Sequence, residues 1–358
     1  MTGNAGGAMN RATSANGSIL NPIVTVILVL AALYVAHSVF IPLTFSLFVI
    51  ALVWPLQAAL QKRMPKLLAL FITLAITIFV VLTVSSAVLW GLSRLVQWLI
   101  ANAGHYQAVF NEWSQWLNEQ GIAVAGPLTE LFNVRWLSGF LQTLMKQFNS
   151  MAGFLTLVFV FVMLGLLEVD DFNERLRLPS VQPMGATMLR ANRMIGTKLR
   201  RFMVVRSFAS VLTGLFVWSF SLLAGLELAA AWGAIAFALN YIPFLGPLIA
   251  TIFPTLFAIV QFESWQTAVT VFLCLNAIQF ITGSYIEPRV TGSTLTISPF
   301  AVVFVVFFFS FLWGLQGAFI GVPILIAVVV YCAQFPSTRW LAVLAAGGGA
   351  QADPAPES

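Results

Sequence analysis

Long apolar runs follow one another along this chain, separated by segments that carry most of its charges. A bilayer crossing takes about 20 apolar residues. Six plain runs are close to that length or longer, and they lie at 20–36, 38–54, 67–92, 151–168, 207–225 and 266–283. Two further runs, 230–262 and 299–334, are longer and are interrupted by glycine and proline. The pattern predicts an all-α, polytopic membrane helical bundle of about eight apolar segments, two of them broken.

The composition supports a membrane protein. Hydrophobic residues make up 60% of the 358 residues and charged residues only 8%, whereas soluble domains carry about 25% charged residues. Because the helices of such a bundle do not fold apart, we expect one transmembrane domain over 20–338. A flexible cytoplasmic N-terminus (1–19) precedes it, and a disordered C-terminal tail (339–358) follows.

The chain lacks the residues that several classes of function require. The chain has two histidines and neither an HExxH zinc pair nor a GxSxG nucleophile turn, so the sequence predicts no enzyme, no metal site and no cofactor. Cys274 and Cys332 both lie in apolar runs and are interpreted as small core residues rather than as a disulfide. Loop cations explain the net charge of +5, and no nucleic-acid partner is expected.

The distribution of cations predicts the orientation, because cytoplasmic loops are enriched in Lys and Arg. The 55–66 loop holds three cations and no acid, and 168–206 holds eight cations against four acids, so both are predicted to be cytoplasmic. The 93–150 segment balances three of each and is predicted to lie outside. Counting crossings from these segments places both termini in the cytoplasm.

Two of the connecting segments are predicted to be helical. In 93–150, aromatic and apolar residues recur at helical spacing and indicate amphipathic helices. The first set is Tyr106, Phe110, Trp113 and Leu117. In 169–206, a basic helix that touches anionic lipid headgroups explains a cluster of cations. These are Arg190, Arg193, Lys198, Arg200, Arg201 and Arg206.

The first interrupted run, 230–262, is too long for one span and too short for two full spans with a loop. Its interruption is "NYIPFLGP" at 240–247. Prolines at 243 and 247 remove backbone donors, and Gly246 permits a reversal. The freed backbone groups cannot face lipid, so Asn240 and Tyr241 are expected to act as polar partners in a buried or wet site. The candidate substrate-binding residues here are Asn240, Tyr241, Pro243, Gly246 and Pro247.

The second interrupted run, 299–334, has the same design. Its interruption is "WGLQGAFIGVP" at 313–323, with Gln316 as the polar side chain and Gly317 beside it as a second candidate substrate contact. The predicted structural breaks are Gly314, Gly321 and Pro323, with Pro288 and Pro299 upstream. Each interrupted run follows a plain span of opposite direction, so we expect two inverted re-entrant hairpins that meet at a midplane binding site. Simple kinks or pairs of short spans would give the same parity.

Polar residues inside apolar runs are rare here and are therefore candidates for function. Asn276 and Gln279 lie in the 266–283 span and are added to the substrate-binding set. Glu287 and Arg289 are the only charged residues between Glu263 and Arg339. They are predicted coupling residues, either as a pair or with Glu287 binding an ion or a proton. A solvated loop pair is the alternative.

At these residues the sequence resembles the autoinducer-2 exporter family of PerM-like bacterial inner-membrane permeases. The matching stretches are "NYIPFLGP" (240–247), "YIEPRVTGSTLTISPFAVV" (285–303) and "WGLQGAFIGVPILIA" (313–327). The resemblance implies an inner-membrane export permease and a homo-oligomer, with autoinducer-2 efflux in some members and sodium or lithium exchange for protons in others. One departure is Ser298 before Pro299, where relatives often have His, so a proton relay at that position is in doubt.

The predicted function is export of a small polar solute such as autoinducer-2 through the midplane site. A monovalent cation/proton antiporter is the alternative, and a channel is a further one. The last four apolar runs carry cations only near their ends. This disfavours a strongly anionic substrate and leaves neutral polyols, sugars or a monovalent cation.

Overall fold

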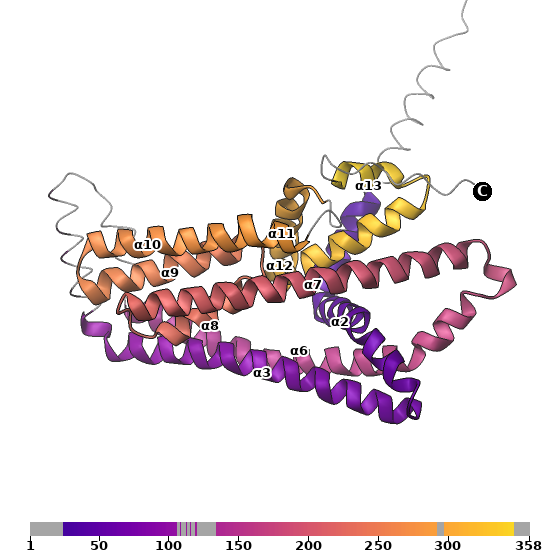
Figure 1. The fold of residues 1–358 in the computed structure, drawn as a ribbon, viewed down its shortest axis with the longest axis horizontal. Coiled ribbons are helices and arrows are strands. Elements are labelled where there is room, and N and C mark those ends of the chain that lie inside the picture. The colour runs from indigo at the N-terminus through magenta and orange to yellow at the C-terminus, as the bar shows by residue number, and fades with distance from the viewer. Residues whose placement is uncertain are drawn as a thin grey trace, which may run out of the picture.

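The structure is a computed structural model that describes residues 24–105, 134–291 and 297–346, together with residues 108, 112, 115 and 119. Helices dominate this part of the chain (Figure 1), as predicted. They are Val24–Val35, α2 (His37–Gln61), α3 (Lys66–Ala101), α6 (Val134–Arg175), the 3₁₀ helix η1 (Pro179–Val181), α7 (Met184–Leu223), α8 (Ala229–Leu239), α9 (Leu245–Phe262), α10 (Trp265–Phe280), the π-helix η2 (Ile281–Ile286), α11 (Glu287–Thr291), α12 (Pro299–Gln334) and α13 (Arg339–Ala345).

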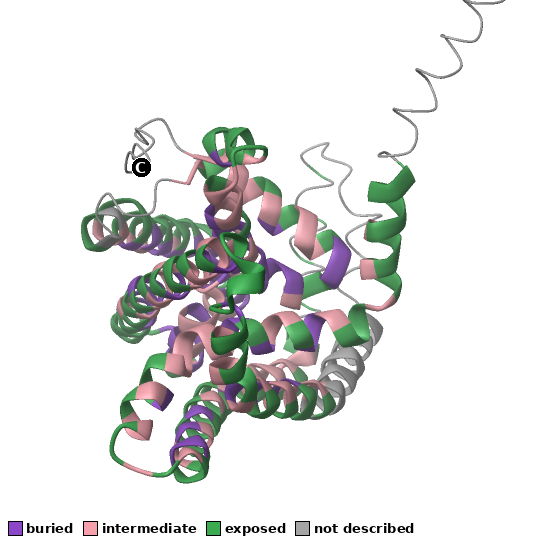
Figure 2. Cartoon of the chain, turned by 90° about the vertical axis from the view of Figure 1, so that its right-hand side faces the viewer, coloured by how far each residue is buried: buried purple, intermediate pink, exposed green. Residues whose placement is uncertain are grey.

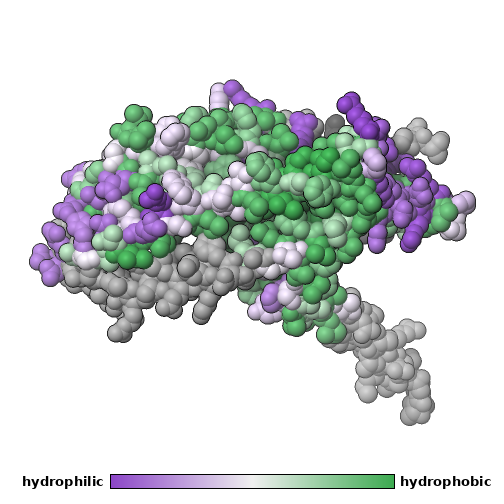
Figure 3. Space-filling view, turned by 90° about the horizontal axis from the view of Figure 1, so that it is seen from below, coloured by the Kyte–Doolittle hydropathy of each residue, from purple (hydrophilic) through white to green (hydrophobic). Residues whose placement is uncertain are grey.

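Seven of the described helices are long and apolar enough to cross a membrane. Hydrophobic side chains cover the middle of the face seen in Figure 3, and hydrophilic side chains gather toward its two ends. Figure 2 shows buried residues where helices turn toward one another and exposed ones on the outer faces. Many of the exposed residues are large and apolar. An apolar exterior of this kind matches lipid as the surrounding solvent.

Several helices are longer than the predicted spans. The 40 residues of α7 extend about 60 Å at 1.5 Å per residue, twice the hydrocarbon thickness of about 30 Å. The basic segment before residue 207 and the following span are therefore one continuous helix. The 42-residue α6 likewise joins the 151–168 span to the end of the predicted outside segment. The four residues of the first amphipathic set in that segment all lie outside the described residues. They are Tyr106, Phe110, Trp113 and Leu117.

The first two predicted spans do not form a hairpin. Helix Val24–Val35 and α2 are separated by Ala36 alone. Backbone hydrogen bonds from Ala36 N to the Ala32 carbonyl (2.9 Å) and from Phe40 N to the Ala36 carbonyl (3.1 Å) continue the helical pattern through the junction. The chain bends there without reversing. Val24–Val35 is shorter than the seven helices that are long and apolar enough to cross a membrane, so two crossings in this stretch and a cytoplasmic N-terminus stay predictions.

Residues 339–345 also differ from expectation. The sequence predicts a disordered tail there, and the structure has helix α13 instead. Its end is tied to the start of α12, because Ser298 N donates to the Ala345 carbonyl (3.0 Å) and Ile297 pairs with Ala346. Within α13, Ala342 is buried, whereas Trp340, Val343 and Leu344 are exposed.

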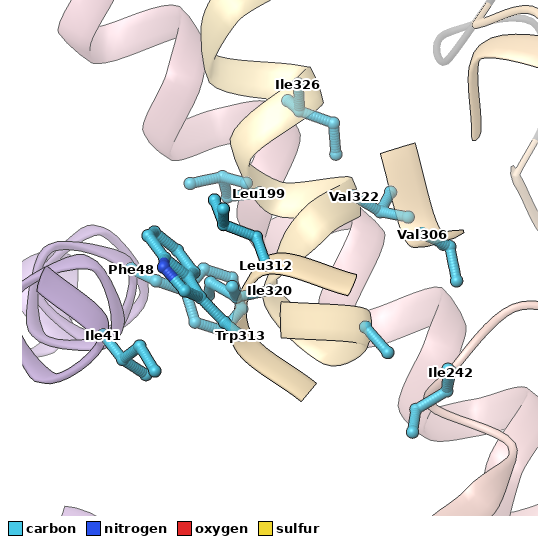
Figure 4. Packing of buried hydrophobic residues seen from close by; sticks show 11 residues of the cluster. Ile41, Phe48, Leu199, Ile242, Val306, Leu312, Trp313, Ile320, Val322 and Ile326 are labelled. Atoms are coloured by element: carbon cyan, nitrogen blue, oxygen red, sulfur yellow. The ribbon is translucent and has the colours of Figure 1, made fainter. Parts of the chain in front are cut away.

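Among the described residues, the core consists of three buried clusters. One lies between α2, α3 and α6 around Leu166, and a second lies between α7, α8, α9 and α10 around Val217. The third surrounds α12 (Figure 4), where Ile41 and Phe48 of α2 lie near Trp313 and Ile242 lies on the other side of the cluster. This third cluster positions the candidate site.

Candidate functional site

The first interrupted run folds as a helical hairpin, which we call hairpin 1 (α8, residues 240–244 and α9). Its helices pack side by side, with the rings of Trp232 and Phe257 centred 5.2 Å apart. The reversal uses a positive φ of 64° at Phe244. A side chain at Gly246 would overlap the carbonyl oxygen of Leu239, so only glycine allows the two helices to meet this closely.

The second interrupted run is also a hairpin, which we call hairpin 2 (residues 299–334). Its arms reverse at Gly314, where φ is 64° and ψ is −145°. A Cβ at Gly317 would overlap the Phe309 carbonyl, and one at Gly321 would lie 3.1 Å from the Val305 carbonyl. Both residue pairs are centred on position 313, as antiparallel arms require. The predicted breaks at Gly314 and Gly321 are thus a turn and a close contact between the arms.

The two hairpins approach from opposite ends of α7. The open end of hairpin 2 lies near the start of α7, where Tyr331 Oη donates to Asn192 Oδ1 (3.1 Å). The open end of hairpin 1 lies just past the end of α7, where Gln261 Nε2 donates to the Gly225 carbonyl (2.8 Å). Between these points, the tip of hairpin 1 meets the second arm of hairpin 2. The rings of Tyr241 and Phe319 are centred 6.1 Å apart, so the predicted inverted arrangement is confirmed.

The tip of hairpin 1 makes polar contacts with the middle of α7. Asn240 Nδ2 donates to Ser210 Oγ (3.2 Å), and Tyr241 Oη donates to Ser207 Oγ (2.9 Å). Asn240 and Ser210 are both buried. Buried hydrogen bonds of this kind hold the tip in an apolar surrounding that offers few competing partners.

A buried ion pair lies one residue from these contacts. Arg206 Nη1 is 2.9 Å from Glu287 Oε2, and the two side chains are 10% and 24% exposed. Glu287 opens α11 directly after the π-helix η2, and such π segments are frequent at functional sites. The guanidinium of Arg289 instead lies over the Tyr285 ring, 3.9 Å from its centroid. The pairing that the sequence suggests for Glu287 is therefore made with a residue of α7.

The structure brings some of the predicted site residues together and separates others. The tip of hairpin 1 carries Asn240, Tyr241, Pro243, Gly246 and Pro247. Gln316 and Gly317 follow the reversal of hairpin 2, where the neighbouring Trp313 Nε1 donates to the Leu33 carbonyl (3.1 Å). Glu287 joins the residues of the hairpin 1 tip through Arg206. Asn276 is exposed, and its Nδ2 donates to the Phe272 carbonyl of its own helix (2.8 Å). Arg289 and Pro299 are also exposed, Pro323 is buried within hairpin 2, and Pro288 lies in α11.

Sequence reasoning missed the residues of α7 that receive the tip. Ser207 and Ser210 lie in a run interpreted as a plain span, and Arg206 was grouped with the cations that face lipid headgroups. The available signal is the spacing of Arg206, Ser210, Thr213 and Ser221, which puts them on one helical face. Within the residues that the structure describes, no group of three or more His, Cys, Asp or Glu side chains could hold a metal ion.

Comparisons with known proteins identify the family of this chain. The family model described as "AI-2E family transporter" matches residues 23–336. A protein of Borreliella burgdorferi named "Putative transport protein" is 27% identical over 319 residues, which cover 87% of this chain and 86% of that protein. The AI-2 transport protein TqsA of Escherichia coli is 25% identical over 320 residues, covering 89% and 92%. The chain therefore belongs to the AI-2E transporter family.

Proposed function

We propose that this protein is a bacterial inner-membrane permease that exports a small polar solute, such as autoinducer-2, through the site where the two hairpins meet. The observation that carries this proposal is the contact of two inverted hairpins at the middle of α7, with buried polar groups at the contact. Broken helices of this type form midplane substrate sites in transporters. The relative named as an AI-2 transport protein supports the choice of solute.

The chemistry of the site favours a neutral solute. Its polar groups at the tip are hydroxyls and an amide, namely those of Ser207, Ser210, Asn240 and Tyr241. The nearby Arg206 and Glu287 neutralise each other. A strongly charged substrate would meet no unbalanced opposite charge from this pair, whereas hydroxyl and carbonyl groups could exchange hydrogen bonds with the tip.

The test combines export with binding. A strain that overexpresses the protein should release more autoinducer-2 than the same strain with an empty vector. Asn240→Ala should weaken solute binding about tenfold to a hundredfold, because a lost buried hydrogen bond is worth roughly 1–3 kcal/mol. Because the same substitution removes the hydrogen bond to Ser210 Oγ, its melting temperature should fall by a few degrees, and binding is compared at a temperature where both proteins are folded. Gly246→Leu is the contrasting variant, since it overlaps the Leu239 carbonyl and should reduce stability itself. If Asn240→Ala leaves solute binding unchanged, the tip of hairpin 1 is not part of the binding site.

The Arg206–Glu287 pair favours a second candidate, a monovalent cation/proton antiporter. A largely buried carboxylate beside the site could exchange a cation for a proton while Arg206 balances its charge. Proteoliposomes with an imposed pH gradient separate the two functions. Sodium-dependent dissipation of the gradient would support antiport, and counterflow of labelled autoinducer-2 without dissipation would support solute export. A channel would dissipate a solute gradient without counterflow.

The remaining proposals concern the lipid contacts, the oligomeric state and the membrane orientation of the protein. Arg190, Arg193 and Arg201 are exposed on α7, and we propose that they contact anionic lipid on the cytoplasmic side. Arg206 is buried and does not belong to this surface. A homo-oligomer and a cytoplasmic C-terminus remain part of the proposal, and cross-linking in native membranes together with reporter fusions would test them.

A further inference from the structure

One face of α7 is buried over much of its length and is largely polar. Its positions recur at intervals of three or four residues, as one side of a helix requires. They are Arg206, Ser210, Thr213, Val217 and Ser221, and each is at most 8% exposed. From the first to the last this stripe covers about 22 Å at 1.5 Å per residue, most of the hydrocarbon thickness of about 30 Å.

Helix α10 and its continuation face this stripe. α7 and α10 contact each other and run in opposite directions (Figure 1). Arg206 pairs with Glu287 at one end of their contact, and Val217 shares a buried cluster with Leu275 at the other. Counting inward from these two contacts pairs Thr213 with Gln279. Thr213 lies one helical turn beyond Ser210, which accepts a hydrogen bond from the tip of hairpin 1.

Thr213 and Gln279 leave hydrogen-bonding atoms unused. Within the described part of the chain, neither Thr213 Oγ1 nor the Oε1 and Nε2 of Gln279 has a hydrogen-bond partner, although the residues are only 0% and 9% exposed. A threonine inside a helix usually donates to a carbonyl of the preceding turn, as Thr282 does to Ile278 (2.9 Å). Unpaired polar groups are costly when buried, so a partner from outside the chain is expected at this point.

We propose that Thr213 and Gln279 form a binding site for a hydroxyl group, which comes from water or from the transported solute. The solute part rests on the proposed function. A hydroxyl group both donates and accepts hydrogen bonds. The Gln279 amide offers a donor and an acceptor, and the Thr213 hydroxyl can act as either, so both kinds of bond can form here. A carboxylate or an ammonium ion would find no opposite charge on either side chain. The site extends the hairpin contact along α7 toward Ser221.

Radiolytic footprinting tests the site, because hydroxyl radicals formed from a bound water oxidise the side chains beside it. The reporter is Trp232, which is 2% exposed and belongs to the buried cluster that begins one helical turn from the site, at Val217 and Leu275. Trp218 is 44% exposed and serves as the lipid-facing reference on α7. In the full chain in lipid nanodiscs without solute, Trp232 should be oxidised faster than Trp218. Equal or slower oxidation of Trp232 would overturn the proposal.

Two variants assign the signal to the site. Thr213→Val keeps the side-chain shape, and Gln279→Leu replaces the amide with a slightly shorter apolar side chain. Each should lower Trp232 oxidation several-fold. Thr270→Val is the matched control, since Thr270 is exposed on α10 and donates to the Gln266 carbonyl of its own helix (2.9 Å). Both test variants should fold, because each replaces buried polar atoms that have no partner in the described part of the chain with apolar ones. Oxidation that is unchanged in both would also overturn the proposal.

A second arm identifies the source of the hydroxyl. If the solute supplies it, saturating autoinducer-2 should reduce Trp232 oxidation in the wild type, and Gln279→Leu should weaken autoinducer-2 binding about tenfold. If water supplies it, Trp232 oxidation should be the same with and without autoinducer-2. Failure of the proposed function would appear as absent transport with Trp232 oxidation intact, so the two failures are distinguishable.

Discussion

Removing the carboxylate of Glu287 should destabilise the protein, although the substitution Glu287→Gln changes little in shape. Arg206 would keep its guanidinium buried without a charged partner, since its side chain is only 10% exposed. Removal of one partner from a buried ion pair costs roughly 3–5 kcal/mol. Glu287 is 24% exposed and retains some hydration, so we expect about 3 kcal/mol, the low end of that range.

The measurement is the free energy of unfolding in mixed micelles as the denaturing detergent is increased. Arg206→Met combined with Glu287→Gln should recover most of the loss, because it removes the unpaired charge. Asp170→Asn is the matched control. Its pair with Lys66 is longer, at 3.4 Å, and both side chains are 38% exposed, so its loss should be at most about 1 kcal/mol. Equal losses for Glu287→Gln and Asp170→Asn would refute the claim that burial sets the strength of the Arg206–Glu287 pair.

Two further predictions concern the hairpins, and a third concerns the membrane orientation. Cysteines at Tyr241 and Phe319, in a background without the native cysteines, should cross-link with a short reagent because the two rings are centred 6.1 Å apart; absence of any product would place the tips apart. Gly317→Ala should lower the free energy of unfolding by about 1–3 kcal/mol through overpacking against the opposite arm, whereas Gly283→Ala, which meets open space, should not lower it by this route. A reporter fused after Arg201 should read cytoplasmic and one fused between α3 and α6 should read outside; the reverse result would overturn the orientation.

The hairpins could be predicted because their signals are local. Proline and glycine limit the backbone within a few residues of where they stand, so "NYIPFLGP" and "WGLQGAFIGVP" mark reversals without knowledge of any neighbour. The bend at Ala36 shows the limit of the same reasoning. Two adjacent apolar runs predict two spans, and only the backbone hydrogen bonds across residue 36 reveal that the chain does not turn back.

The contacts across the bundle could not be predicted in this way. Asn276 and Gln279 are three residues apart on a helix that is largely apolar all round, so no amphipathic pattern indicates which side faces α7. The structure leaves Asn276 exposed and buries Gln279. Ser207 and Ser210 are small enough to pass as ordinary residues of an apolar span, and their role appears only when the tip of hairpin 1 is placed against them.

Arg206 connects the site to the prediction of orientation. The positive-inside rule counts cations as if each faced the aqueous side, but Arg206 is turned inward to Glu287, which follows it by 81 residues. A cation held in a buried pair says little about which side of the membrane its segment faces. Without Arg206, the 168–206 segment still has seven cations against four acids. The predicted cytoplasmic location of this segment therefore does not depend on the residue that the site recruits, and the site and the orientation can be tested separately.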